Sequence, residues 1–464
     1  MKTNLTRRGF FGTAAAGVCA LPVLSATVQE VVPAGQFKEE AKLLPVKDEV
    51  DVIVCGGGPA GFAAAISAAR AGAKTRLFEM HGCLGGIWTT GSLSWILGGR
   101  SSGIGKELAE RLDVLGARVK QPSTYTYACD PEVLKLVLEE MCEEAGVRIR
   151  LHTAVRSVCR DGRRVTGVIT ESKSGREVWK AKQFVDATGD GDVGALAGCG
   201  YEMGIEGRNG LCQPMSLNAL LYMKDAEAIK KHLVDETSKA DLSQRFRSKT
   251  VKFREEIKRG CGEYPSYAQP SIFYLDNHFG LAMFNHEYQV RADNAEDITR
   301  ATMQARKEMH RIVDGLRKLG GVWEDLKIVS IGEQIGIREG RRIEGLAKVT
   351  FEDLMAGIKP SDTVVVTGAG CDVHQLVADK EKSPSLKRGK VKPYGVPLRA
   401  LIAKDVDGLM MAGRCISGDF YAHSSYRLTG TAAALGEVAG KTCALAAKNG
   451  CLPQGVPVDD VNDR

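Results

Sequence analysis

A glycine-rich turn between a buried strand and a small-residue helix is the sequence feature that most limits the fold of this chain. The apolar run 50–55 predicts a strand, 62–71 predicts an Ala-rich helix, and 74–79 predicts a second strand ending in Glu79. Such a βαβ unit of about 30 residues is the context in which a GxGxxG turn indicates dinucleotide binding. The pyrophosphate lies at the helix N-terminus, and the acid that ends the second strand accepts hydrogen bonds from ribose hydroxyls. The turn residues expected at the dinucleotide are Gly56, Gly58, Pro59, Ala60 and Gly61.

The remaining pattern predicts an α/β protein in which the dinucleotide-binding, Rossmann-like domain is discontinuous. Three strand-like runs with turn signals between them predict a β-meander, and charged amphipathic helices then replace the small apolar residues. Small apolar residues return near the C-terminus. We therefore expect a leader at 1–26, a linker at 27–47, a first cofactor-domain segment at 48–204 with the meander at about 147–187, an inserted α+β substrate domain at 205–395, a second cofactor-domain segment at 396–450, and a tail at 451–464.

The N-terminus resembles a twin-arginine signal peptide. Arg7 and Arg8 precede a mildly apolar run rich in Ala and Gly, and no acidic residue occurs before Glu30. A membrane anchor needs about 20 strongly apolar residues, and Pro22 interrupts this run. The leader predicts export of folded protein to the periplasm, and no other segment predicts a stable membrane span. Basic and acidic residues are interleaved along the chain, so a nucleic-acid partner is not indicated.

Several ordered sequence blocks resemble one family. They are DVIV-x-GGGPAG at 51–61, HGCLGG at 81–86, DATGDGD at 186–192, GIREGRRI at 336–343, DVH at 372–374, VPLR at 396–399 and LMMAGRCIS at 409–417. Together they resemble FAD-dependent oxidoreductases with a flavin fold of the glutathione-reductase type, related to the flavin-binding part of heterodisulfide reductase. The resemblance covers most of the chain beyond the leader.

The resemblance implies a non-covalently bound FAD, since no attachment motif is evident. It also implies further cofactor contacts after the second strand, after the meander, after the late strand 409–412 and at the start of the last helix. The N-terminus of that helix would favour negative charge on the reduced flavin. The residues implied by these blocks are Gly85, Gly86, Gly189, Asp190, Gly413, Arg414, Gly430 and Thr431.

The cysteine spacing argues against two kinds of redox centre, a dithiol and an iron–sulfur cluster. Of the 13 cysteines, the closest pair is Cys443 and Cys451, and no CxxC or CxxxxC occurs. A redox-active dithiol is therefore not indicated. A [4Fe-4S] cluster, which the relation to heterodisulfide reductase raises, is not expected either, because such clusters usually use closely spaced thiolates. No metal site is expected.

Two polar groups are candidates for catalysis. His423 and Arg427 lie between the late strand and the last helix, and the alternative for His423 is a helix cap or a backbone partner. Asp372 and His374 form a second pair, with a simple turn as the alternative. An arginine clamp for a substrate carboxylate or for the flavin could be made by Arg338, Arg341 and Arg342. The other interpretation is that they lie on a solvated helix face.

These expectations predict an FAD-dependent enzyme that oxidises a small hydroxylated or sugar-derived molecule by hydride transfer to flavin N5. His423 would act as the acid–base group and an arginine would orient the substrate. Electrons would leave to a quinone, a cytochrome or oxygen. The alternatives are a flavin reductase and an electron-transfer subunit, each working with a redox partner protein.

Overall fold

The computed structural model describes residues 37, 39–98, 103–119, 126–208, 210–233 and 242–463. The chain divides into two units, Met1–Leu43 and Leu44–Arg464. In the first unit the described residues, 37 and 39–43, belong to no helix or strand. The leader predicted at 1–26 and the linker predicted up to residue 36 lie outside the described residues.

A seven-stranded sheet forms the centre of the second unit. Its strands follow the order β6-β2-β1-β9-β8-β7, and β18 pairs with the C-terminal part of β9. The strands β6, β2, β1, β9 and β18 are parallel, whereas β7, β8 and β9 form antiparallel hairpins in the region where the sequence predicts a meander. The bounds are β1 Val46–Cys55, β2 Thr75–Phe78, β6 Arg148–Arg150, β7 Ala154–Asp161, β8 Arg164–Ser172, β9 Gly175–Asp186 and β18 Leu409–Met411. The carboxyl ends of β1, β9 and β18 therefore meet at one edge.

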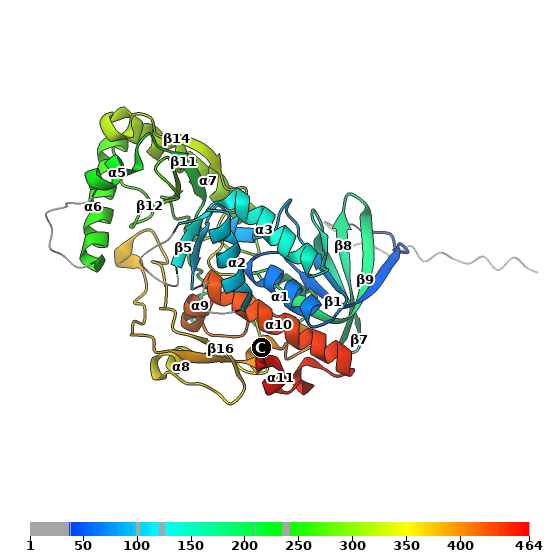
Figure 1. Ribbon diagram of the computed structural model, residues 1–464. Helices are drawn as coiled ribbons and strands as arrows, with labels where there is room; N and C mark the ends of the chain where they lie inside the picture. The colour runs from blue at the N-terminus through cyan, green and yellow to red at the C-terminus, as the bar shows by residue number, and fades with distance from the viewer. Residues whose placement is uncertain are drawn as a thin grey trace, which may run out of the picture. The chain divides into compact units, whose positions relative to one another are not determined.

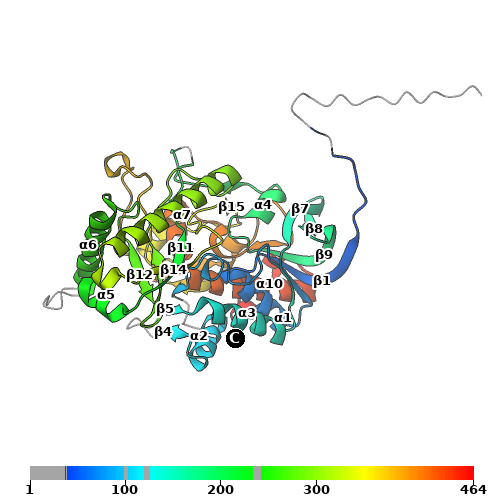
Figure 2. The same cartoon turned by 90° about the horizontal axis from the view of Figure 1, so that it is seen from above.

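Two small-residue helices lie side by side against this sheet (Figures 1 and 2). They are α1 Pro59–Arg70 and α10 Thr429–Asn449. A Cβ atom on Gly436 would lie 1.9 Å from the carbonyl oxygen of Ala60, and one on Gly440 would lie 2.0 Å from that of Ala64. The backbones thus approach so closely that only glycine fits at these two positions, and this packing fixes the start of each helix relative to the other.

Gly440→Ala is expected to destabilise the protein by about 1–3 kcal/mol, because the added methyl group collides with backbone that cannot move as a side chain would. In an open helix the same change would stabilise, since alanine is the better helix former. Denaturant unfolding of the purified protein measures the effect. Gly455→Ala is the control, because its Cβ would only make an ordinary contact, 3.6 Å from Cys451 Cβ. Equal unfolding midpoints for Gly440→Ala and the wild type would contradict this packing account.

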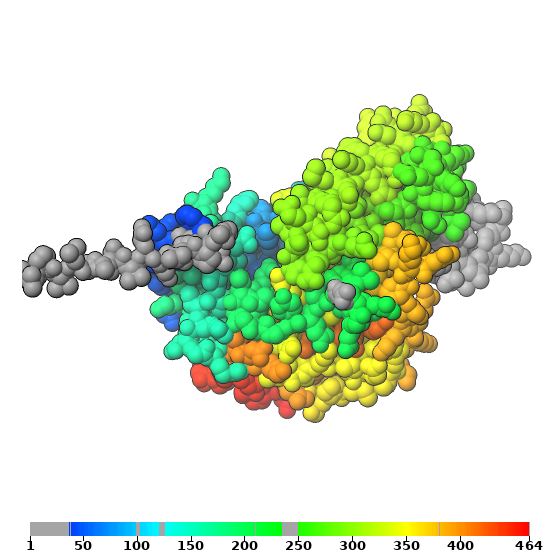
Figure 3. Space-filling view, turned by 180° about the vertical axis from the view of Figure 1, so that it is seen from behind, coloured from blue at the N-terminus to red at the C-terminus, as the bar shows by residue number. Residues whose placement is uncertain are grey.

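A second, antiparallel sheet has the order β12-β13-β11-β14. Long helices accompany it, and Figures 1 and 2 show this group together at the end of the unit opposite β8 and β9. Figure 3 shows its residues, green to yellow-green, gathered on one part of the surface in view. The bounds are β11 Asn218–Tyr222, β12 Ser271–Tyr274, β13 Phe279–Met283, β14 Lys327–Ile331, α5 Ala226–Leu233, α6 Leu242–Cys261 and α7 Ala295–Lys318.

The predicted α/β class is confirmed by the parallel sheet with its α1 crossover and by the return of the chain to that sheet at β18. The proposed domain boundaries stay a prediction. None of the helices in the described ranges is both long and apolar enough to cross a bilayer. The remaining elements are β3 Trp95–Leu97, α2 Gly103–Val114, β4 Arg118–Val119, β5 Thr126–Cys129, α3 Pro131–Glu144, α4 Asp192–Leu196, β10 Tyr201–Glu202, β15 Arg342–Ile343, α8 Phe351–Ala356, β16 Thr363–Thr367, β17 Tyr394–Pro397, α9 Phe420–Tyr426 and α11 Val458–Asn462.

Candidate active site

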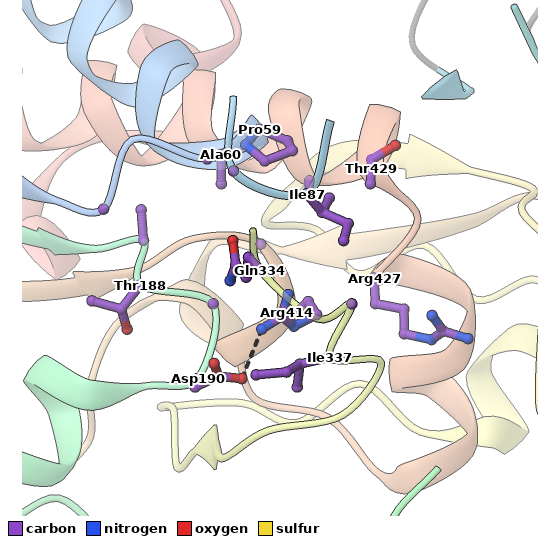
Figure 4. Close-up of a pocket in the computed structure, with 18 of the residues that line it drawn as sticks. Pro59, Ala60, Ile87, Thr188, Asp190, Gln334, Ile337, Arg414, Arg427 and Thr429 are labelled. Atoms are coloured by element: carbon purple, nitrogen blue, oxygen red, sulfur yellow. Dashed lines mark hydrogen bonds and ion pairs between the residues drawn. The ribbon is translucent and has the colours of Figure 1, made fainter. Parts of the chain in front are cut away.

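A cavity of about 390 Å³ runs from the glycine turn after β1 to a polar cluster beside the antiparallel sheet. Figure 4 shows that its wall combines the start of α1, the start of α10, the loop after β9 and the segment before β15. Open α/β sheets bind their ligands at the carboxyl ends of the strands. The predicted cofactor residues that line the cavity are Gly56, Gly58, Pro59, Ala60, Glu79, Gly86, Gly189, Asp190, Gly413 and Arg414.

The three glycines of the turn differ in what they leave room for. Gly56 has φ +98°, and its Cβ would lie 2.5 Å from the carbonyl oxygen of Ala187. A Cβ on Gly61 would lie 1.7 Å from the carbonyl oxygen of Gly56. At these two positions a side chain would collide with the protein's own backbone, so glycine is required whether or not a ligand is bound. Gly58 is not, because its φ is −70° and its Cβ would approach only Gly86 Cα, at 3.9 Å. The space in front of Gly58 is therefore open to a ligand, as a pyrophosphate at this helix start requires.

Glu79 follows β2 and is buried, with 4% of its surface exposed. Its Oε2 accepts a hydrogen bond of 2.6 Å from the Gly57 N–H, and its Oε1 accepts one of 2.8 Å from the His81 N–H. A carboxylate offers about four acceptor positions. The side chain is thus fixed to the glycine turn and still lines the cavity with acceptor capacity for ribose hydroxyls.

Asp190 and Arg414 form an ion pair on the opposite wall. Arg414 Nη2 donates a hydrogen bond of 2.7 Å to Asp190 Oδ1, which Figure 4 marks. Burial raises the pKa of Asp190, although the charge of Arg414 opposes that shift. The pair connects the loop after β9 to the end of β18 and leaves this part of the wall without net charge.

The remaining cofactor candidates support the cavity from behind. The cavity lining does not include Gly61, Gly85, Gly430 or Thr431. Gly85 has φ +103° and precedes the 3-10 helix Gly86–Trp88. Thr431 Oγ1 lies 3.3 Å from Thr367 Oγ1. Thr429, the first residue of α10, does line the cavity, and no side chain caps this helix start. Its unpaired backbone N–H groups favour an anionic group here.

A chain of hydrogen bonds forms the other end of the cavity. Ser216, Arg338, Asp372, His374 and Arg427 line it, and the buried His286 joins them. His286 Nδ1 lies 2.9 Å from Ser216 Oγ, His286 Nε2 lies 2.9 Å from His374 Nδ1, and His374 Nε2 lies 3.3 Å from Asp372 Oδ2. Arg427 Nη2 donates to Asp372 Oδ2 at 3.1 Å.

The donors and acceptors in this chain allow two proton arrangements. Ser216 Oγ lies 2.6 Å from the Asn285 carbonyl oxygen and 2.9 Å from His286 Nδ1, which itself lies 2.8 Å from the same carbonyl oxygen. The neutral ring of His286 carries its proton on Nδ1 or on Nε2, and His374 correspondingly donates from Nδ1 to His286 or from Nε2 to Asp372. In both arrangements the imidazole of His374 and the carboxylate of Asp372 are in contact on the cavity wall.

Charges and burial determine how these groups titrate. Partial desolvation opposes ionisation of Asp372, but the His374 hydrogen bond and the charges of His374, Arg427 and Arg338 hold the pKa of Asp372 well below its usual range. Burial and the charge of Arg338 lower the pKa of His374 to about 4, against the opposing effect of Asp372. At neutral pH the pair is therefore a carboxylate beside a neutral imidazole.

The three candidate clamp arginines have different partners. Arg338 lines the cavity, whereas Arg341 Nη1 donates to the Asp190 carbonyl oxygen and to Asp192 Oδ1. Arg342 is 3% exposed and pairs with Glu339 at 2.5 Å. Of the three, only Arg338 contributes to the cavity wall, and the other two stabilise surrounding backbone.

His423 is not brought to the cavity. It lies within α9, is fully buried and is absent from the lining, and neither ring nitrogen has a hydrogen-bond partner among the described residues. Burial, together with the charges of Arg342, Arg427 and Arg414, lowers the pKa of His423 well below its usual value. The cavity wall instead receives Arg427 from the end of α9. This geometry favours His374 over His423 as the acid–base group.

Several residues in the cavity wall or directly behind it have no motif in the sequence. Ser216, Tyr267 and His286 come from the predicted inserted domain, and Tyr267 stacks on His286 with ring centroids 4.0 Å apart. Trp95 and Phe273 stack at 4.6 Å and contribute an aromatic part of the wall. In the described ranges, no group of three or more His, Cys, Asp or Glu residues is arranged to hold a metal ion.

Comparison with known protein families gives a match over most of the chain. The family model described as FAD dependent oxidoreductase matches residues 51–464. Thiamine thiazole synthase of Pyrococcus horikoshii is 29% identical over 152 residues, which are 31% of this chain and 58% of the synthase. The alignment thus spans little more than half of that relative's length. Leghemoglobin reductase of Glycine max is 59% identical over 39 residues, 8% of each chain.

Two solved structures of other proteins align with most of this chain at low sequence identity. The p-nitrophenol 4-monooxygenase of Pseudomonas putida DLL-E4 is 10% identical, with a TM-score of 0.47 over 90% of this chain and 84% of the other. A geranylgeranyl bacteriochlorophyll reductase-like protein of Thermoplasma acidophilum is 14% identical, with a TM-score of 0.42 over 90% of this chain and 81% of the other.

Proposed function

Because this chain belongs to the FAD dependent oxidoreductase family, we propose that it oxidises a small hydroxylated organic molecule bound at the polar end of the cavity, with non-covalently held FAD along the rest of it. The observation that carries this proposal is the contact between His374 Nε2 and the Asp372 carboxylate, on the wall of the cavity that begins at the glycine turn. An alcohol that loses a hydride must also lose its hydroxyl proton, and this pair is placed to accept one.

The residues of the chain divide the remaining tasks. FAD would be held by Gly58, Glu79 and the start of α10, and when bound it supplies a hydride acceptor at N5. In the tautomer of His374 that carries its proton on Nδ1, the substrate hydroxyl donates its proton to Nε2. The resulting imidazolium then donates a hydrogen bond to Asp372 Oδ2, and the carboxylate stabilises its charge. In this tautomer His286 Nε2 accepts a hydrogen bond from His374 Nδ1–H, and the contact holds the ring in place.

The pH profile follows from the lowered pKa of His374. His374 acts in its neutral form, which persists above its pKa of about 4, and Asp372 remains ionised throughout. The second-order rate constant for flavin reduction, which reports the free enzyme, should be constant from about pH 6 to 8 and should fall as the pH drops toward 4. Stopped-flow absorbance with retained FAD checks this. A rise of about tenfold between about pH 5.5 and 7.5, as for an ordinary histidine, would contradict the assignment.

Anaerobic mixing with hydroxylated compounds tests the proposed reaction. Sugars, sugar acids, hydroxy acids and simple alcohols are added to the oxidised protein, and the loss of the flavin absorption band is followed in a single turnover. We expect rapid bleaching by at least one of these classes. Bleaching by NAD(P)H or a reduced partner protein, with none by any hydroxylated compound, would instead support the reductase or electron-transfer alternative.

We also propose that the chain is exported in folded form by the twin-arginine route, on the basis of the leader sequence. That route suits a protein whose cofactor is inserted in the cytoplasm. Outside the cytoplasm no ready NAD(P)H pool exists, which favours oxidation of a substrate and transfer of the electrons to a quinone, a cytochrome or oxygen.

Changing Arg7 and Arg8 together to Lys is expected to leave folded, flavin-loaded protein in the cytoplasm, because the arginine pair is the signal that the export machinery recognises. Cell fractionation followed by flavin absorbance measures the distribution. The matched control is Lys2→Arg, which keeps the leader charge and leaves the pair intact. Undiminished export of the double variant would count against the proposal, as would exported protein that retains residues 1–26.

A further inference from the structure

Arg338 presents a partly buried positive charge to the polar end of the cavity. Its Nη1 donates hydrogen bonds of 2.8 Å to both the Pro214 carbonyl oxygen and Ser216 Oγ. Among the described residues, the other terminal nitrogen, Nη2, has only the thioether sulfur of Met283 as an acceptor, at 3.6 Å. One edge of the guanidinium is therefore fixed by the protein, while Nη2 has a single weak acceptor.

The charges around Arg338 do not balance. Arg338, Arg427 and Asp372 line this end, and Asp372 already accepts from Arg427. Among the described residues no carboxylate forms an ion pair with Arg338, whereas Arg341 and Arg342 each have one. Burial and the charge of Arg427 lower the pKa of Arg338 to about 10, but it remains charged at neutral pH. Removing an uncompensated charge from water is costly even when the removal is partial, so a binding partner of opposite charge is the expected compensation.

We propose that Arg338 is the anchor for a carboxylate group of the substrate, so that the substrate is a hydroxylated organic acid. The inference rests on the proposed function and names its substrate class. A guanidinium held along one edge is suited to a carboxylate because its planar donors match the two oxygens. The hydroxyl to be oxidised then lies toward His374, whose Nδ1 belongs to the same hydrogen-bonded chain through His286 and Ser216.

Binding of the acid also makes His374, the proton acceptor, more basic. The positive charge of Arg338 is one of the causes that lower the pKa of His374, and the substrate carboxylate would neutralise it. The groups that face His374 are Arg338, Arg427, Asp372, His286 and Tyr267. With Arg338 paired, Asp372 acts against less opposition and His374 becomes a stronger base. A bound organic acid thus raises the pKa of His374 and favours proton transfer from its own hydroxyl group. A neutral alcohol of the same shape does not have this effect.

The test is an equilibrium measurement that needs no turnover. Acetate and propionate, with acetamide and propionamide as neutral counterparts, are titrated into the oxidised, FAD-loaded protein at neutral pH. Binding is followed by flavin difference spectra and by ligand-observed NMR. These probes carry no hydroxyl group, so they report the anion site whether or not any alcohol reduces the flavin. A failure of the proposed reaction therefore leaves this result unaffected, and the two are distinguishable.

We expect saturable binding of the acids, at least about tenfold tighter than of the amides, and loss of that preference in Arg338→Gln. Arg338→Lys should keep part of it, because the charge remains without the planar donors. Arg300→Gln is the control, since Arg300 is exposed on α7 and pairs with Asp297. FAD content and unfolding midpoints show whether each variant is folded. Equal binding of acids and amides by the wild type would overturn the proposal. So would an unchanged preference in Arg338→Gln with a shifted flavin midpoint potential, which would assign the charge to the cofactor.

Discussion

Gly58→Val is expected to give folded protein without bound FAD. The backbone at Gly58 is compatible with any residue, and its Cβ would approach only Gly86 Cα, at 3.9 Å. The protein alone therefore tolerates the side chain, while the γ carbons fill the space at the start of α1 that a pyrophosphate requires. We expect FAD affinity to fall at least a hundredfold, about 3 kcal/mol, as measured by flavin absorbance after purification and by FAD titration.

The matched control is Gly455→Val, which places the same side chain where it makes an ordinary contact outside the cavity. That variant should retain full FAD content. Circular dichroism and the unfolding midpoint of the apoprotein separate loss of binding from loss of folding. Normal yellow protein from Gly58→Val would show that the pyrophosphate does not lie at this turn.

His374→Gln is expected to slow flavin reduction by about 10²–10⁴-fold, the usual contribution of general acid–base catalysis, with unchanged FAD content. Glutamine can keep a hydrogen bond with His286 but cannot accept the proton at the position of Nε2. Asp372→Asn should slow the same step, because the imidazolium then loses the carboxylate that stabilises it. Anaerobic single-turnover absorbance measures both rates.

Two further histidine variants sharpen this prediction. His310→Gln changes an exposed residue on α7 and should leave the rate unchanged. His423→Ala tests the residue favoured by the sequence, and its position outside the cavity leads us to expect flavin reduction at nearly the wild-type rate if the variant folds. A slow His423→Ala enzyme together with a fast His374→Gln enzyme would reverse our assignment.

The dinucleotide end of the cavity could be predicted because its information is local. The strand, turn, helix and second strand follow one another within residues 46–79, and their glycines and Glu79 have fixed spacing. The same pattern identified Gly58 and Glu79 as lining residues. It could not identify which glycines face a ligand and which face backbone, since Gly61 and Gly440 differ from Gly58 only in their three-dimensional contacts.

The polar end could be predicted only in part because its residues are distant in sequence. Ser216 and His286 are 70 residues apart, and His286 and His374 are 88 apart. Nothing near His286 distinguishes it from a structural histidine. The DVH block did indicate Asp372 and His374, but His423 was favoured because it lies between two cofactor elements, and the chain buries its ring within α9.

The position of bound FAD tests the account most directly. A crystal structure of the FAD-loaded protein should show the adenosine ribose beside Glu79, the pyrophosphate over Gly58, and the flavin ring at the start of α10 facing Asp372 and His374. Density for FAD in another place would contradict the account. A flavin ring directed away from the polar end, with His374 and Arg338 out of reach of any molecule bound against N5, would contradict it equally.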